Sequence, residues 1–321
     1  MPEFSRRDFF RKAATDTAAA GILSAGVLNL RANPLGMPIG SQTYSHRQRI
    51  KDGDLAGLCK DMVSIGVGAL EMCSPAYPEF AGLADGKRTR KILDDNGIKC
   101  PSCHFEMSEL RTKQNEAIAW AKDLGMTQMG TSTLGQPGGH GGPGLPGMDA
   151  DVIAMDVIKR AADEYNKIGE VAAKAGLQQF VHNEGFELKK AVDGRFVYEV
   201  LLELYDTKLV KMQFQISSMR TIGDPVMWFN KYPGCFVSMH VQGVNLNAPM
   251  PAPRGAGAPT GPGGPGGARR GGTPGLAVGK DTLDWPKIFA AAKTGGVKNY
   301  FIEQAWDLTV ESAAYLKTLN V

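Results

Sequence analysis

The chain has 321 residues, of which 43% are apolar and 21% charged, with a formal net charge of +3. This composition excludes disorder throughout and can supply one large core, because barrel domains often reach this size. The small net charge argues against a nucleic-acid-binding surface, and the chain after residue 32 lacks the long apolar run that a membrane span needs. We therefore expect a soluble enzyme or binding protein.

Residues 1–32 are expected to direct export rather than to join the fold. A charged segment with paired Arg6 and Arg7 precedes a weakly apolar stretch at 13–30, which is the order of an n-region and an h-region. The pattern resembles a twin-arginine export signal, so the export machinery is an expected partner and the periplasm the expected location. An amphipathic N-terminal helix with a chance arginine pair is the alternative.

Strand-like and helix-like patterns alternate through residues 33–321. Eight strand-like runs lie at 38–40, 67–71, 98–100, 126–129, 177–181, 209–212, 235–239 and 297–301. Helical patterns lie between them at 55–65, 113–124, 152–175, 198–206 and 285–293. Such alternation predicts parallel strands joined by helical crossovers, and eight units close into a (β/α)8 TIM barrel forming a single domain.

Two Gly/Pro-rich inserts interrupt this order at 135–148 and 248–275. The second holds ten glycines and seven prolines in 28 residues, a composition that disfavours both helix formation and strand pairing. Both follow strands, so we expect loops on the functional rim, either lids or tolerated flexible insertions. Arg254, Arg269 and Arg270 could attract an anionic group, whereas His140 is expected to be solvated.

The five cysteines are too sparse for a disulfide scaffold. They are Cys59, Cys73, Cys100, Cys103 and Cys235. Residues 100–104 form C-x-x-C-H, the attachment signature of a c-type haem, yet they lie in a segment that reads as a buried strand. Packing thiols, a disulfide and haem are the three interpretations, and packing thiols are favoured.

Four of the strand-like runs end in polar residues. The segments are 182–187 (HNEGFE), 213–215 (QFQ), 240–242 (HVQ) and 302–304 (IEQ). In a parallel barrel the carboxyl ends of the strands meet at one rim, so these side chains are expected to converge on a metal or a sugar.

The chain resembles the sugar phosphate isomerase/epimerase superfamily, the xylose isomerase-like TIM barrels, from about residue 38 to residue 319. The similarity is carried by 68–71, 102–105, 182–187 (which resembles H-N-H-x-x-E-F), 223–226, 231–234, 238–242, 284–288 and 300–304. Each segment is weak alone, and their common order and spacing make the resemblance specific.

The resemblance implies one divalent metal ion (Mn, Zn, Mg or Fe) held by side chains of strands five to eight. The implied ligands are Glu187, Gln215, His240 and Glu303, with Glu184 and His182 as further candidates. Gln215 stands where the family has an aspartate, and a neutral amide should bind a hard cation more weakly. Gly243 also stands where an aspartate is common.

A metal that binds two adjacent sugar oxygens would acidify the C–H between them, and Glu187 and Glu303 are the expected acid/base pair. Substrate contacts are expected from Glu71, His104, His182, Gln304 and Trp306. We expect a metal-dependent carbohydrate isomerase/epimerase working through an enediolate-type intermediate. The alternatives are a lyase or hydrolase of 3-oxo-glycosides and a non-catalytic sugar-binding barrel. A homo-oligomer is compatible with this sequence, and no phosphate-binding motif is present.

Overall fold

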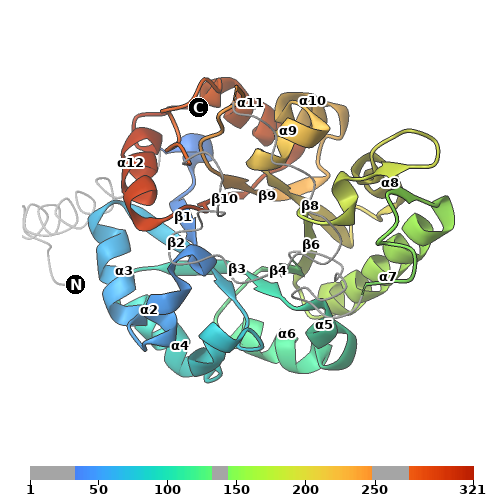
Figure 1. The fold of residues 1–321 in the computed structure, drawn as a ribbon. Coiled ribbons are helices and arrows are strands. Elements are labelled where there is room, and N and C mark those ends of the chain that lie inside the picture. The colour runs from blue at the N-terminus through green and yellow to red at the C-terminus, as the bar shows by residue number, and fades with distance from the viewer. Residues whose placement is uncertain (1–32, 132–143, 248–274) are drawn as a thin grey trace, which may run out of the picture.

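Eight parallel strands close into a barrel in the computed structural model, which describes residues 33–131, 144–247 and 275–321. The strand order around the barrel is β1-β10-β9-β8-β6-β4-β3-β2 (Figure 1). The strands are β1 Ile39–Gln42, β2 Val67–Cys73, β3 Lys99–Phe105, β4 Gln128–Thr131, β6 Gln178–His182, β8 Val210–Gln215, β9 Phe236–Val241 and β10 Asn299–Ile302. Each overlaps one of the eight expected runs, so the predicted TIM barrel is confirmed.

Helices surround the barrel and cover the outer faces of its strands (Figure 1). They are α2 Arg47–Lys51, α3 Leu55–Ser64, α4 Gly86–Asp95, α5 Met107–Thr112, α6 Gln114–Asp123, α7 Met155–Lys174, α8 Val197–Leu204, α9 Met219–Ile222, α10 Pro225–Lys231, α11 Trp285–Gly295 and α12 Trp306–Leu316. Local sequence sets both ends of helix α11. Asp284 caps its first turn, and Gly296, in the left-handed region, ends it. None of the helices in these three ranges is long and apolar enough to cross a membrane.

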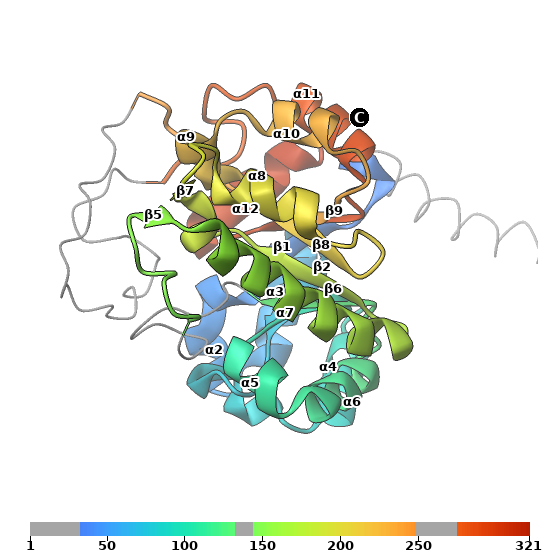
Figure 2. The same cartoon turned by 90° about the vertical axis from the view of Figure 1, so that its right-hand side faces the viewer.

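A short two-stranded parallel sheet was not expected from the sequence. It pairs β5 (Val152–Ile153) with β7 (Lys190–Ala191) and lies beyond the carboxyl ends of the barrel strands (Figure 2). The helix predicted over 152–175 therefore begins three residues later, at Met155. Lys189 holds the same region together by donating from Nζ to the backbone carbonyls of residues 148, 149 and 150.

Two phenylalanines fill the barrel interior beneath the polar side chains. Phe180 of β6 is the pairing partner of Gly130 on the neighbouring strand β4, and Phe301 of β10 is the partner of Gly40 on β1. A Cβ added at Gly130 would lie 2.4 Å from the Phe180 ring, and one at Gly40 would lie 2.5 Å from the Phe301 ring. The small residues are therefore needed for these rings to fit.

All five cysteines lie within the described residues, and all are free. Cys100 and Cys103 are buried in β3, and His104 of the same strand contacts rings inside the barrel. Burial also raises the pKa of the Cys103 thiol well above its ordinary value. Strand β3 is part of the barrel wall, so covalent attachment of haem would require the wall to open, and the packing interpretation fits these thiols.

Several sequence-based expectations fall outside the described residues. These are the export segment 1–32, His140, Arg254, Arg269 and Arg270, and most of the two Gly/Pro-rich inserts.

Candidate functional site

Polar side chains from four strands converge at the carboxyl end of the barrel. His182 ends β6, Gln215 ends β8, His240 lies one residue before the end of β9, and Glu303 directly follows β10. Glu184 lies two residues beyond β6. The parallel arrangement brings together residues that are up to 121 positions apart, as the sequence predicted for this rim.

Two carboxylates meet at the side-chain amide of Gln215. Nε2 of Gln215 donates to Glu303 Oε2 over 2.6 Å and to Glu184 Oε1 over 3.2 Å. The Glu184 side chain is 45% exposed and that of Glu303 is 20% exposed, so both are accessible to a ligand. Loss of hydration raises the pKa of Glu184, but His182, Gln215 and His240 outweigh it and hold the pKa below its ordinary value.

His182 lies beside this carboxylate pair with neither ring nitrogen in a hydrogen bond. Both nitrogens are buried, and Nε2 lies 3.6 Å from Glu184 Oε1, beyond hydrogen-bonding distance. A buried polar atom without a partner costs about 1–3 kcal/mol, so such an atom in a rim position points to a missing ligand.

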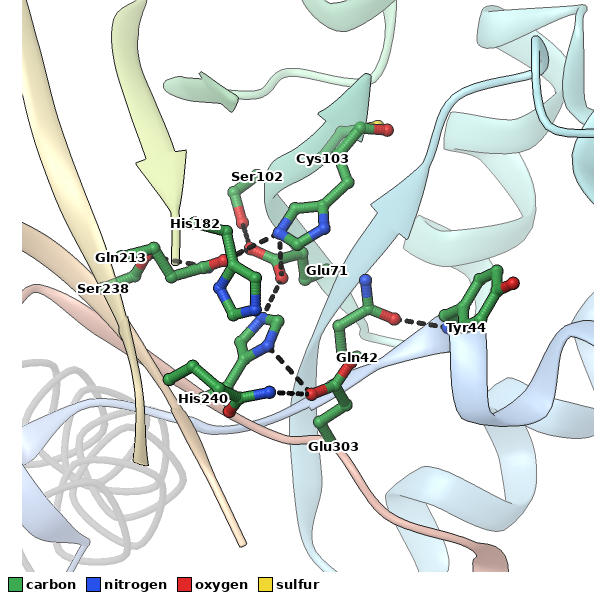
Figure 3. Close-up of polar contacts among 12 residues, drawn as sticks. Gln42, Tyr44, Glu71, Ser102, Cys103, His182, Gln213, Ser238, His240 and Glu303 are labelled. Carbon is green, nitrogen blue, oxygen red and sulfur yellow. Dashed lines mark hydrogen bonds and ion pairs between the residues drawn. The ribbon is translucent and has the colours of Figure 1, made fainter. Parts of the chain in front are cut away.

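His240 is held between two carboxylates. Its Nε2 donates to Glu71 Oε1 over 2.5 Å, while its Nδ1 lies 3.3 Å from Glu303 Oε2 without hydrogen-bond geometry (Figure 3). Burial lowers the pKa of His240, but the adjacent Glu71 and Glu303 raise it to about 10. Without a metal ion, both ring nitrogens are therefore protonated near pH 7. Nε2 is anchored on Glu71, and Nδ1 faces the rim, where a metal ion would displace its proton.

Glu71 lies deeper in the barrel than its place in the sequence suggests. The carboxylate is fully buried and accepts hydrogen bonds from Ser102 Oγ at 2.6 Å and Gln213 Nε2 at 2.7 Å, in addition to His240. Burial raises the pKa of Glu71, and the neighbouring His104 and His240 reverse this and lower it to about 2. Glu71 is thus a buried anion with its oxygens occupied, and not the expected contact for a substrate hydroxyl.

His104 belongs to the same deeper layer. Its Nε2 donates to Gln213 Oε1 over 2.7 Å, and its ring packs against the rings of His182 and His240 at 5.2 and 5.3 Å. Burial lowers the pKa of His104 to about 4, so the ring is neutral near pH 7. The expected substrate contact from His104 is therefore replaced by a packing role beneath the rim.

The described residues contain two groups of potential metal ligands, His104/His182/His240 and His182/Glu184/Glu303, whose ligand atoms lie within 4.8 Å of one another. In the first group, Nε2 of His104 and Nε2 of His240 already donate to Gln213 and Glu71. In the second, the carboxylate oxygens keep free lone pairs and the ring nitrogens of His182 make no hydrogen bond. The second group is the better place for a cation.

Glu187, an expected ligand and base, belongs to neither group. It lies in the 3-10 turn Phe186–Leu188, fully buried, where Oε2 accepts from the Gly185 N–H over 2.8 Å and Oε1 has no partner. Burial raises the pKa of Glu187 to about 7. The structure thus brings Glu184, the second candidate, to the rim in place of Glu187.

Gln304 and Trp306 were also expected to contact substrate. Gln304 is buried, with Nε2 donating to the Leu276 carbonyl and Oε1 accepting from Ser312 Oγ, both over 2.6 Å, so its amide is already satisfied within the protein. Trp306 opens α12, is partly exposed, and lies edge-on to His46 at 6.1 Å. Trp306 remains available at the rim, and Gln304 does not.

Three residues that organise the site were given no individual role from the sequence, although Asn183 and Gln213 lie in the polar segments 182–187 and 213–215. Asn183 accepts the backbone N–H of Gln215 over 2.8 Å, and Gln213 links Glu71 to Ser238 Oγ, 2.9 Å away. Gln213 could have been found, because the period-two pattern of a strand puts it on the same face as Gln215. Asn183 and Ser238 carry no such signal.

The residues present fit a divalent metal ion. His182 offers a nitrogen without a partner, Glu184 and Glu303 offer oxygens, and Gln215 Oε1 and His240 Nδ1 are buried atoms that lack hydrogen bonds. This mixture of imidazole and oxygen donors suits Zn, Mn or Fe as well as Mg.

The closed eight-stranded barrel and its surrounding helices match the fold of solved xylose isomerase-like TIM barrel proteins. A sugar phosphate isomerase/epimerase from Parabacteroides distasonis is 21% identical, with a TM-score of 0.62 over 87% of this chain and 93% of that one. A probable 3-DHS dehydratase from Bacillus anthracis is 12% identical, with a TM-score of 0.63 over 87% and 98%.

A third solved structure holds a metal ion. A xylose isomerase-like TIM barrel protein from Mycobacterium smegmatis, in complex with magnesium, is 14% identical, with a TM-score of 0.57 over 87% of this chain and 95% of that one. No protein-family profile matches the chain, and no curated protein sequence does. At these identities the likeness establishes the fold.

Proposed function

We propose that this chain is a divalent-metal-dependent enzyme that isomerises or epimerises a carbohydrate by moving a proton at a carbon next to a carbonyl group. One observation carries the proposal. Glu184 and Glu303 converge on Gln215 at the carboxyl end of the barrel, beside a histidine whose ring nitrogens have no partner. The solved isomerase/epimerase and the magnesium-bound barrel of the same fold support it.

Glu184, Glu303 and His182 would hold the metal, with His240 Nδ1 and Gln215 Oε1 facing the same place. When bound, such an ion would polarise adjacent substrate oxygens and thereby lower the pKa of the C–H between them. The ion would also provide a partner for one of the two unpaired nitrogens of His182.

The two carboxylates would handle the proton. The lowered pKa of Glu184 keeps this side chain ionised at neutral pH, so it can accept a proton from the substrate carbon. Glu303 follows a different strand and, in its protonated form, would donate its own proton to the neighbouring carbon or to the other face of the same carbon, while the proton held by Glu184 would exchange with solvent. Return to the neighbouring carbon gives isomerisation, and return to the other face gives epimerisation.

The described rim favours a sugar without a phosphate group. Arg47 donates to the Tyr44 carbonyl over 2.9 Å and lies 3.9 Å from Glu79, while Lys189 is held by three backbone carbonyls. These cations are engaged within the protein, and the carboxylates at the centre would repel an anion. Trp306 offers a partly exposed ring against which a sugar face can stack.

The test combines metal analysis with proton exchange. Purified protein loaded with Mn²⁺, Zn²⁺ or Mg²⁺ is incubated in D₂O with a panel of ketoses and 3-oxo-glycosides, and NMR follows deuterium at carbon. We expect deuterium in both substrate and product, with turnover at saturating metal reduced by about 10²-fold or more in Glu184→Gln and Glu303→Gln. Glu199→Gln, which changes a carboxylate on α8 that contacts Lys231, is the matched control.

Other outcomes would redirect the assignment. Release of a β-substituent would indicate a lyase, and sugar binding to metal-loaded protein without deuterium uptake would indicate a non-catalytic barrel. Absence of bound metal from the native protein, even after loading, would refute the proposed chemistry.

A further inference from the structure

The carboxylate of Glu71 connects opposite parts of the barrel interior. Glu71 lies on β2 and His240 on β9, and these strands are separated around the barrel by β1 and β10. Their hydrogen bond therefore crosses the interior and does not follow the sheet (Figure 3). Neither side chain is exposed, so solvent does not compete for this contact.

The two oxygens of Glu71 have different partners. Oε2 accepts from Ser102 Oγ at 2.6 Å and from Gln213 Nε2 at 2.7 Å, which fixes the plane of the carboxylate. Oε1 then points at Nε2 of His240, 2.5 Å away, with His104 Nε2 at 3.3 Å. Gln213 is itself held by Ser238 and His104, so the carboxylate has little freedom to rotate.

This arrangement determines which nitrogen of His240 faces the site. An ionised carboxylate can only accept, so Nε2 of His240 must carry a proton to satisfy it. The other nitrogen, Nδ1, lies 3.3 Å from Glu303 Oε2 and makes no hydrogen bond. Carboxylates that hold metal-binding histidines in this manner fix both the ring orientation and the tautomer.

We propose that Glu71 is a positioning residue that keeps a proton on Nε2 of His240, so that Nδ1 is the nitrogen that binds the divalent metal. The inference rests on the proposed function for the metal itself, but the hydrogen bond and the proton on Nε2 can be observed without it. Glu71 does not touch the substrate in this scheme, and acts through His240.

The first experiment measures the tautomer directly. The chain has five histidines, so ¹⁵N-histidine labelling gives a spectrum simple enough to assign with a His240→Gln variant. In Zn²⁺-loaded protein we expect His240 to show a protonated Nε2 and a metal-shifted Nδ1 in a long-range ¹H–¹⁵N correlation spectrum. A metal-shifted Nε2 would overturn the inference.

The second experiment changes the carboxylate. Glu71→Gln keeps the size of the side chain, but its amide can donate to Nε2 and so favours the opposite tautomer. We expect the Kd for Zn²⁺, measured by calorimetric titration, to rise about 10- to 100-fold, with the His240 signals shifted. Glu199→Gln is the matched control and should leave both unchanged. A Glu71→Gln protein with native affinity and a native His240 spectrum would contradict the proposal.

Failure of the metal site and failure of the Glu71 inference are distinguishable. If the wild-type protein takes up no Zn²⁺, the proposed function fails, and the metal-free spectrum still tests Glu71. A downfield, slowly exchanging Nε2 proton on His240 supports the positioning role of Glu71 there, and its absence refutes that role. This wild-type measurement also decides the matter if Glu71→Gln does not fold.

Discussion

The amide of Gln215 donates from Nε2 to Glu303 Oε2 over 2.6 Å, and the same nitrogen donates to Glu184 at 3.2 Å. A neutral side chain thus joins two carboxylates at the position where the sequence resemblance implies a third. Its Oε1 is buried without a partner. A half-turn of the amide exchanges the two ends, so Gln215 can hold the carboxylates together or offer an oxygen to a cation between them.

Gln215→Asp should strengthen divalent metal binding. The substitution replaces a neutral oxygen donor with a charged one, and it also places three carboxylates together when metal is absent. We expect a Kd for Mn²⁺ at least about tenfold lower, which corresponds to about 1.4 kcal/mol. The Tm of the metal-free variant should fall below that of the wild type and recover on adding Mn²⁺. Gln178→Asp, at the first residue of β6, is the control at the other end of the barrel. Equal Mn²⁺ affinities in wild type and Gln215→Asp would show that residue 215 does not face the ion.

His182→Leu should lose metal affinity without losing stability in the absence of metal. Both ring nitrogens of His182 are buried without partners, a cost of about 1–3 kcal/mol that an apolar side chain removes. We expect the metal-free variant to have an unfolding free energy equal to that of the wild type or about 1 kcal/mol higher, measured with urea. His46→Leu, at a buried histidine near Ser41, provides the comparison. A loss of more than about 1 kcal/mol in metal-free His182→Leu would mean that its nitrogens have partners in solution.

Glu187 should make stability depend on pH between 4.5 and 7. Burial raises its pKa from 4.5 to about 7, so the folded protein binds a proton that the unfolded chain has released in this interval. The contribution to stability is complete below pH 4.5 and is lost as pH rises through 7, by about 3 kcal/mol. Urea unfolding at pH 5 and pH 8 should show this decline in the wild type. The side chain of Glu187→Gln stays neutral, so the unfolding free energy of this variant should fall by about 3 kcal/mol less than that of the wild type over the same pH range. Parallel pH profiles for the two proteins would rule out a protonated Glu187 in the folded state.

Gly130→Ala should destabilise the barrel directly beneath the site. Its Cβ would lie 2.4 Å from the Phe180 ring and 2.5 Å from a backbone oxygen, so either the ring or the strand pairing must shift. Overpacking of this kind costs about 1–3 kcal/mol. Gly82→Ala is the matched control, because a Cβ there meets nothing within 4 Å. Thermal unfolding monitored by circular dichroism should show a lower Tm for Gly130→Ala and an unchanged Tm for Gly82→Ala.

Export by the twin-arginine route remains a proposal based on Arg6 and Arg7. Replacing both with lysine keeps the charge but removes the paired guanidinium groups. In a bacterial host with this export route, we expect the wild-type chain in the periplasmic fraction and the Arg6→Lys, Arg7→Lys variant in the cytoplasm, measured by immunoblotting of fractions. Periplasmic recovery of both proteins would exclude the twin-arginine assignment.

The sequence by itself determined the barrel and the location of the site. Eight short apolar runs alternate with amphipathic segments, and this alternation has few solutions other than parallel strands with helical crossovers. Because the carboxyl ends of such strands share one rim, the sequence alone places His182, Gln215, His240 and Glu303 close together.

Tertiary structure decided which way the individual side chains face. Glu184 and Glu187 are three residues apart in one loop, and only the 3-10 turn at Phe186–Leu188 shows that the first reaches the rim while the second is buried. Glu71 and His104 read as rim residues from their places near strand ends, yet partners on β8 and β9 hold them below it. Periodicity gives the face of a strand but not the depth of a side chain in a barrel or the path of a loop, because both depend on residues far away in the chain.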